Sequence, residues 1–107
     1  MPPRIKVGIP EARTMDGVVF DSIRECRRYA ELKMLLRSGI ISNLELQPKF
    51  PIVLNGQHIC NYISDFRYLD QNGKTIVEDS KGMRTEIYRL KAKLFHACYP
   101  QLRIIEV

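Results

Sequence analysis

Residues 75–82 read Thr75-Ile76-Val77-Glu78-Asp79-Ser80-Lys81-Gly82, and this stretch says most about the fold. β-Branched residues open it and a Lys-Gly pair closes it, which predicts a strand that ends at residues 81–82. Side chains alternate along a strand, so Asp79 shares a face with Val77 and Lys81. A carboxylate and an ammonium group are therefore expected side by side at a strand end. A salt bridge at that strand end explains the same pattern without any site.

The residues just before this stretch predict an antiparallel neighbour. Residues 71–74, Gln-Asn-Gly-Lys, indicate a tight turn, and residues 59–69 form the strand that precedes it. On that strand Asp65 shares a face with Ile63 and Arg67. An isolated charge is disfavoured in such an apolar and aromatic run.

Farther upstream the sequence predicts the first strand of a three-stranded antiparallel meander. Residues 44–47, Leu-Glu-Leu-Gln, alternate in polarity as a strand does, and Pro48 and Pro51 mark an edge or a bend. Asn55-Gly56 is a strong hairpin signal.

A helix is expected before the meander, between an N-terminal cap at Asp21 or Ser22 and a stop at Ser38-Gly39. Its apolar stripe is formed by Tyr29, Leu32, Leu35 and Leu36, with Cys26 on the flank. Glu25 projects into that stripe. Two interpretations stay open for Glu25: it completes a capping box with Ser22, or it is directed inward as part of a functional site.

A second helix is predicted from Thr85 to about Tyr99, where Pro100 stops it. Lys91 falls within its apolar face, and it either runs its stem along the helix or takes part in a site. The expected apolar face consists of Ile87, Leu90, Leu94, Ala97 and Cys98. Residues 102–107 close the chain as a strand parallel to residues 75–80, through a right-handed crossover. The predicted order is αβββαβ, a mixed four-stranded sheet flanked by two helices.

The chain has 107 residues, enough for one small domain. We expect an N-terminal arm over residues 1–14 and a single folded domain over residues 15–107. The three cysteines are odd in number and contain no CxxC pair, which favours reduced thiols and a cytoplasmic protein. No apolar run is long enough to cross a membrane, so we expect no membrane association.

The formal net charge is +5, which favours an anionic partner such as nucleic acid. Residues 38–80 nevertheless hold 3 basic and 5 acidic side chains, between two basic ends. Within this acidic middle, Asp65 and Asp79 are expected to converge near one end of the sheet, and Glu25 to approach from the packed helix. Three carboxylates in one place require protons or a cation, and oxygen ligands suit Mg²⁺ or Mn²⁺.

Such a site suits phosphodiester hydrolysis, in which the metal polarises the phosphate and helps to ionise the attacking water. Lys81 is placed to orient or activate that water, and Lys91 to touch the scissile phosphate. The basic and helix-end residues Arg24, Arg28, Arg84 and Thr85, together with Lys91, are candidate contacts to nucleic acid. A charge run on a helix is also typical of a solvated face, and that alternative stays open for the arginines of the first helix.

The order αβββαβ with Asp65, Asp79-Ser80-Lys81 and a glutamate on the first helix resembles the PD-(D/E)XK nuclease superfamily, and thus a restriction-endonuclease-like α/β core. More closely, the chain from about residue 14 is similar to a small phage and prophage family known as a domain of unknown function. The similar strings are Phe20-Asp21-Ser22, Glu25, residues 28–32, 44–48 and 62–66, Val77 to Gly82, and Tyr88 to Phe95.

This resemblance implies Asp65 and Asp79 as metal ligands, the Ser80 carbonyl as a third, Glu25 as a ligand directly or through water, and Lys81 as the catalytic lysine. Ser64 replaces the proline that names the motif, and Asp79 stands where glutamate is common. Both departures leave the ligand chemistry intact.

The function predicted is a Mg²⁺-dependent phage-type DNA endonuclease of the host cytoplasm. We expect it to select branched DNA such as a Holliday junction or a flap, and to act as a homodimer with two cutting centres. A different class of protein is the competing hypothesis: a catalytically inactive DNA-binding or phage assembly module that retains the nuclease fold. A small RNA-processing factor is less favoured, because no aromatic RNA-binding motif is visible.

Overall fold

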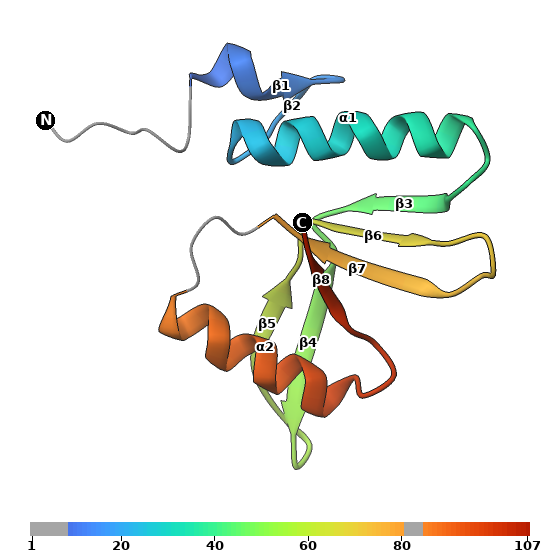
Figure 1. Ribbon diagram of the computed structural model, residues 1–107. Helices are drawn as coiled ribbons and strands as arrows, with labels where there is room; N and C mark the ends of the chain where they lie inside the picture. The colour runs from blue at the N-terminus through green and yellow to red at the C-terminus, as the bar shows by residue number, and fades with distance from the viewer. Residues whose placement is uncertain (1–8, 81–84) are drawn as a thin grey trace, which may run out of the picture.

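A computed structural model describes residues 9–80 and 85–107 of the chain. Its centre is a mixed four-stranded sheet in the order β3-β6-β7-β8 (Figure 1). The strands are β3 (Ser42–Leu46), β6 (Phe66–Leu69), β7 (Thr75–Asp79) and β8 (Ile104–Glu106). β3, β6 and β7 pair antiparallel, and β8 returns parallel to β7. The predicted mixed sheet and its parallel last strand are confirmed.

The predicted strand over residues 59–69 is wrong as one element, because it is divided between two sheets. Its first part belongs to β5 (Gln57–Ile63), which pairs with β4 (Lys49–Leu54) in a separate two-stranded sheet, and its second part is β6. The pairing register nevertheless continues without a slip from one sheet to the other: Leu46 lies opposite Phe66, and Lys49 lies opposite Ile63. The four strands are therefore one long hairpin, bent in the middle.

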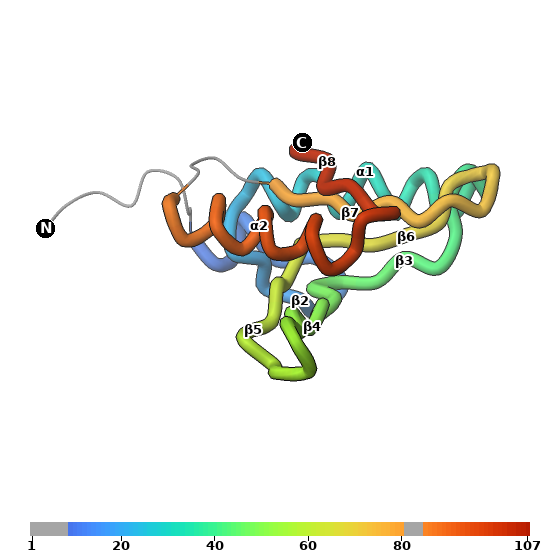
Figure 2. The backbone as a smooth tube through the Cα atoms, turned by 90° about the horizontal axis from the view of Figure 1, so that it is seen from below, coloured from blue at the N-terminus to red at the C-terminus, as the bar shows by residue number. Residues whose placement is uncertain are grey.

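The bend has a local cause in both arms of the hairpin. Gln47 adopts a positive φ of 49° and Pro48 follows it, which redirects the first arm. Two backbone hydrogen bonds span the bend, from Gln47 N to Asp65 O at 2.9 Å and from Ser64 N to Pro48 O at 3.3 Å. Figure 2 shows the β4–β5 end leaving the layer of the main sheet. Asp65 lies at this bend, between Ile63 at the end of β5 and Arg67 in β6.

α1 (Ile23–Arg37) packs on the main sheet and begins and ends where the sequence predicts. Ser22 Oγ accepts the amide of Glu25, which caps the first turn. Burial of one face of the helix against β6 forms the first core cluster: Phe20, Cys26, Tyr29, Leu32, Ile41, Phe66 and Tyr68. Arg24, Arg27 and Glu31 are exposed, as expected for the opposite face.

The segment before α1 is more regular than a free arm. Residues 10–13 form a 3₁₀ helix, η1 (Pro10–Arg13), and a small hairpin joins β1 (Thr14–Met15) to β2 (Val18–Val19). Asp16 and Gly17 both have positive φ, as a tight hairpin turn requires. The structure thus has ordered elements from Pro10, within the arm predicted for residues 1–14. The rest of that arm, residues 1–8, lies outside the described residues.

α2 (Glu86–Cys98) begins after its predicted cap, Thr85, whose Oγ1 accepts the amide of Tyr88. It packs across the β4–β5 hairpin and buries a face different from the one predicted (Figure 1). Ile87 and Leu90 are 68% and 59% exposed, and Phe95 is fully buried. Aromatic side chains fill the space between helix and hairpin, and this rotates the buried face toward them. The second core cluster is Phe50, Ile52, Tyr62, Val77 and Phe95, and Tyr88, Leu94, Cys98 and Tyr99 pack against it.

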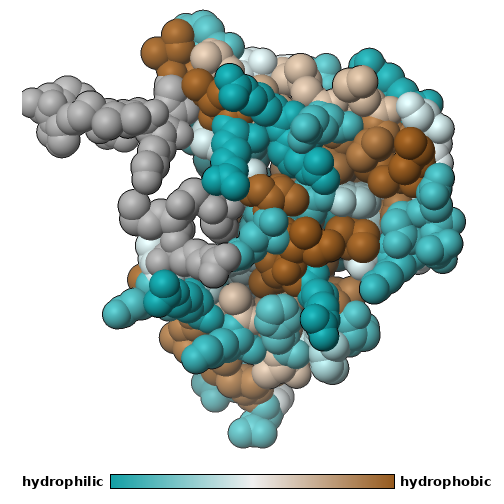
Figure 3. Space-filling model, in the orientation of Figure 1, coloured by the Kyte–Doolittle hydropathy of each residue, from teal (hydrophilic) through white to brown (hydrophobic). Residues whose placement is uncertain are grey.

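Polar and apolar residues are interspersed on the surface. In the space-filling view, hydrophilic side chains cover much of α1, and an apolar patch lies near β8, where Ile105 is 44% exposed (Figure 3). None of the helices within residues 9–80 and 85–107 has the length and apolar character needed to cross a membrane.

Candidate functional site

Glu25 lies in the first turn of α1, and only 2% of it is exposed. Its amide donates to Ser22 Oγ at 3.1 Å, and its Oε2 accepts the amide of Asp21 at 3.0 Å. The capping interpretation is therefore correct, with Asp21 as the backbone partner of the carboxylate. The carboxyl group is also directed inward, where it interacts with Asp65, but its part in a functional site stays a prediction.

Asp65 and Asp79 come together where the bent hairpin meets the end of β7. The amide of Asp65 donates to Asp79 Oδ1 at 3.0 Å, and the amide of Ser80 donates to Asp65 Oδ2 at 2.5 Å. Asp79 is fully buried and Asp65 is half-buried. The predicted convergence of these aspartates is therefore confirmed. The pairing register of β6 and β7, in which Phe66 lies opposite Glu78, places Asp65 beside Asp79 when it is continued by one residue.

The carboxylates perturb one another. Burial, followed by the hydrogen bond and the charge of Asp65, raises the pKa of Glu25 from 4.5 to about 8. At neutral pH the Glu25 carboxyl group therefore holds a proton next to the Asp65 carboxylate. Either this proton or a bound cation relieves the repulsion between the two groups.

The donor chemistry of this cluster fits a hard divalent cation, because Glu25, Asp65 and Asp79 all offer carboxylate oxygens. Within the described ranges, no three His, Cys, Asp or Glu side chains are already arranged as a metal-binding group. Some of the oxygens accept backbone amides instead, as Asp65 Oδ2 does from Ser80. Asp65 thus interacts with both Glu25 and Asp79, but the three carboxylates do not form a closed set of ligands.

Two predicted site residues, Lys81 and Arg84, lie outside the described residues. Ser80, the last residue before that gap, is half-buried, and its Oγ has no hydrogen-bond partner among the residues described. The role of the Ser80 carbonyl stays a prediction.

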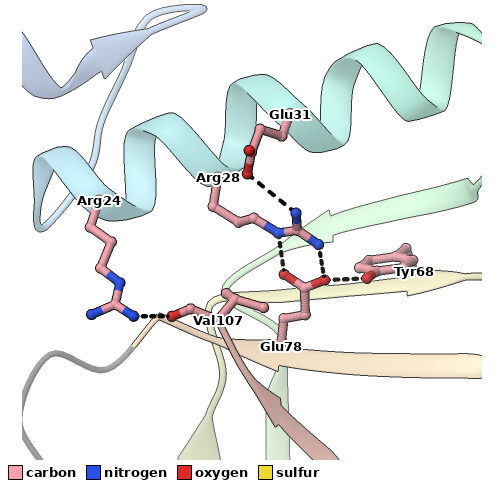
Figure 4. A network of polar contacts seen from close by, with 6 residues as sticks. All are labelled: Arg24, Arg28, Glu31, Tyr68, Glu78 and Val107. Carbon is pink, nitrogen blue, oxygen red and sulfur yellow. Dashed lines mark hydrogen bonds and ion pairs between the residues drawn. The ribbon is translucent and has the colours of Figure 1, made fainter.

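The arginines of α1 do not all face a free surface (Figure 4). Arg24 Nη2 donates to the Val107 carbonyl oxygen at 2.7 Å. Arg28 donates from Nε and Nη2 to the two carboxylate oxygens of Glu78, at 2.8 and 2.7 Å. A guanidinium held at two points by a buried carboxylate is committed to that partner, so the structure favours a structural role for Arg28 over the predicted contact with nucleic acid.

Glu78 and Tyr68 form a polar cluster with Arg28 that the sequence analysis missed. Glu78 is 1% exposed, and the Tyr68 hydroxyl donates to its Oε2 (Figure 4). Burial and the bond to Glu78 raise the pKa of Tyr68, whereas the bond to Glu78 raises the pKa of Arg28. One signal was present: strand alternation directs Glu78 away from Asp79, toward α1, where a buried carboxylate needs a cation.

The second helix supplies the remaining predicted contacts. Thr85 is exposed at the N-cap of α2, and Lys91 is half-buried one turn and a half farther on. Both residues line a pocket with Asn61 and Tyr62 of β5. Lys91 is therefore partly buried, and its role in a site stays a prediction.

One comparison with known proteins bears on this chain. The family described as "Protein of unknown function (DUF1064)" matches residues 10–107, a span that includes all three carboxylates. No curated protein and no solved structure matches the chain. Resemblance to a family of unknown function is thus confirmed, whereas the relationship to PD-(D/E)XK nucleases and the phage association stay predictions.

Proposed function

The chain belongs to the DUF1064 family, and we propose that this member is a divalent-metal-dependent endodeoxyribonuclease of PD-(D/E)XK type. One observation carries the proposal. Glu25, Asp65 and Asp79 come from a helix, a hairpin bend and a strand end, Asp65 interacts with both of the others, and Glu25 and Asp79 are buried. Burial of acidic groups is costly, so such a cluster is favoured where it serves a cation.

In this proposal Glu25, Asp65 and Asp79 hold Mg²⁺ or Mn²⁺, together with the Ser80 carbonyl. The metal would polarise the phosphate, help to ionise the attacking water and neutralise the developing charge. The amide of Asp21 holds the Glu25 carboxyl group, Ser22 Oγ accepts the backbone amide of Glu25, and the amide of Ser80 holds Asp65. These backbone contacts would keep the ligands in position when Glu25 gives up its proton to the solvent.

Two lysines complete the proposed reaction. Lys81 would orient the attacking water, and Lys91 would contact a phosphate of the DNA backbone. Water adds to phosphorus and the bond from phosphorus to the 3′ oxygen breaks, which leaves a 5′-phosphate and a 3′-hydroxyl group.

We further propose that DNA structure, rather than base sequence, determines where cleavage occurs. The elements of the described residues are the four-stranded sheet, two α-helices, one short 3₁₀ helix and two hairpins. Branched DNA, such as a four-way junction or a flap, fits a small protein that acts as a homodimer with one centre in each copy. Light scattering at micromolar protein concentration tests the dimer directly.

Cleavage assays test the proposed function. The wild type is incubated with a labelled four-way junction, a flap and a plain duplex, in Mg²⁺, Mn²⁺ or EDTA. The inactive variant is Asp79→Asn, which keeps an Oδ1 acceptor for the Asp65 amide, and Glu45→Gln is the matched control at an exposed carboxylate. We expect metal-dependent cutting by the wild type and the control, and loss of at least about 100-fold in Asp79→Asn.

The competing function is a DNA-binding or phage assembly module without catalysis. Tight binding to these substrates, with no cutting in either metal at high protein concentration, would favour that module and contradict the nuclease.

A further inference from the structure

A pocket lies next to the carboxylates along the chain, where the end of β5 meets the first turn of α2. It has a volume of about 350 Å³ and includes Ile63, two residues before Asp65. Its polar lining comes from Asn61, Tyr62, Thr85 and Lys91. Among the described residues that line it, Lys91 is the one charged side chain.

Tyr62 is the first indication that this pocket takes a ligand. Only 2% of Tyr62 is exposed, and its ring packs 5.1 Å from that of Phe95 and 6.5 Å from that of Tyr88. Its hydroxyl has no hydrogen-bond partner among residues 9–80 and 85–107. A phenylalanine would fill the same space without a hydroxyl that the described residues leave unsatisfied, so this hydroxyl is available to an acceptor in the pocket.

The first turn of α2 is the second indication. The amide of Tyr88 is capped by Thr85 Oγ1, whereas those of Glu86 and Ile87 have no acceptor in the part of the chain that the structure describes. Free amides and the positive end of a 13-residue helix attract anions. Lys91 lies four residues after Ile87, on the same side of the helix, and adds a full positive charge.

We propose that this pocket binds one backbone phosphate of the nucleic acid, beside the phosphate that is cut. The identity of the ligand as a phosphodiester rests on the proposed function, but the pocket itself is assigned from Tyr62, Lys91 and the α2 terminus. Lys91 supplies the charge, the amides of Glu86 and Ile87 donate hydrogen bonds, and the Tyr62 hydroxyl donates one more. The pocket therefore positions the strand relative to Asp65 and Asp79.

Two probes test the pocket without any need for cleavage. Inorganic phosphate is titrated into ¹⁵N-labelled protein, and a fluorescein-labelled duplex of about 20 base pairs is titrated in EDTA at several KCl concentrations. The variants are Lys91→Gln and Tyr62→Phe. Lys93→Gln is the matched control, since Lys93 is an exposed lysine of the same helix.

We expect phosphate to shift the amide signals of Glu86 and Ile87 in the wild type and in Lys93→Gln, and much less in Lys91→Gln. Lys91→Gln weakens duplex binding about 5-fold or more. It also reduces the slope of log binding constant against log KCl concentration by about one, as expected for the loss of one phosphate contact. Tyr62→Phe weakens binding of both probes while its Tm stays equal to or above that of the wild type, because no internal hydrogen bond is lost.

Each contrary result has a defined meaning. If phosphate leaves the Glu86 and Ile87 signals unchanged, or if Lys91→Gln binds DNA as Lys93→Gln does, the pocket is not a phosphate site, and metal-dependent cutting by the wild type still supports the nuclease. If the wild type does not cut but Lys91→Gln loses phosphate and DNA binding, the nuclease is rejected and the pocket stands. A lowered Tm with normal phosphate binding in Tyr62→Phe would make that hydroxyl structural.

Discussion

The backbone amide of Asp65 donates to Asp79 Oδ1 at 3.0 Å, so one buried carboxylate joins the bend of the long hairpin to the end of β7. Asp79→Ala removes this acceptor, and we expect it to lower the free energy of unfolding by about 1–3 kcal/mol. Asp79→Asn keeps an amide oxygen at the same place and is expected to cost less. Urea denaturation of both variants measures the difference. If Asp79→Ala and Asp79→Asn lose equal amounts of stability, the hydrogen bond from the Asp65 amide does not hold the bend.

The burial of Glu25, together with its contact with Asp65, predicts an unusual dependence of stability on pH. The pKa of Glu25 is about 8 in the folded protein and 4.5 for an ordinary glutamate. Between these values the folded protein retains a proton that the unfolded chain has lost. The contribution of Glu25 to stability is therefore complete below about pH 4.5 and is lost as the pH rises toward 8.

Glu25→Gln is expected to remove this decline, which reaches about 1.4 kcal/mol per pH unit at most. Urea denaturation of metal-free protein from pH 5 to pH 9 measures it, and Glu31→Gln, at an exposed glutamate of the same helix, should keep the wild-type slope. If the stability of Glu25→Gln falls with pH as steeply as that of the wild type, the Glu25 carboxyl group of the wild-type protein titrates normally.

The ion pair between Arg28 and Glu78 predicts a large loss of stability when one partner is removed. Arg28→Ala leaves the Glu78 carboxylate buried without its cation, which is expected to cost about 3–5 kcal/mol. The control Arg27→Ala, at an exposed arginine, should stay within about 0.5 kcal/mol of the wild type. Adding Glu78→Gln to Arg28→Ala should recover part of the loss. A cost below about 1 kcal/mol in Arg28→Ala would argue against a structural pair.

Tyr68→Phe tests the third member of that cluster. The Tyr68 hydroxyl donates to Glu78 Oε2 inside the core, so its removal is expected to cost about 1–3 kcal/mol, while the ring keeps its packing. This change acts on the opposite side of β7 from Asp79, so any metal-dependent cleavage at 25 °C should remain. Chemical denaturation together with the cleavage assay separates the two effects. Loss of cutting in a stable Tyr68→Phe protein would place the cluster in the functional site.

The helix ends and β7 could be predicted because their signals are local. Ser22 and Thr85 cap the helices they precede, and the strand that ends at Asp79 follows a turn at residues 71–74. The inward direction of Glu25 followed from helical periodicity alone. These features depend on neighbours a few residues apart in the chain.

The bend and the buried face of α2 depend on contacts between distant segments. Residues 59–69 have a strand-like composition throughout, and the break at Asp65 arises because Gln47 and Pro48 turn the opposite arm. Phe95 then determines which face of α2 is buried, by filling the space above the projecting hairpin. Arg28 and Glu78 are 50 residues apart, and strand alternation indicates the direction of Glu78 but not which cation it meets.

Calorimetric titration of Mn²⁺ into metal-free protein at pH 7, in two buffers of different ionisation enthalpy, tests the central claim most directly. We predict one ion bound per chain, with release of about one proton because Glu25 must ionise. We also predict loss of this binding in Asp79→Asn and retention in Glu45→Gln. Absence of binding to the wild type, or unchanged binding in Asp79→Asn, would contradict a metal centre formed by Glu25, Asp65 and Asp79.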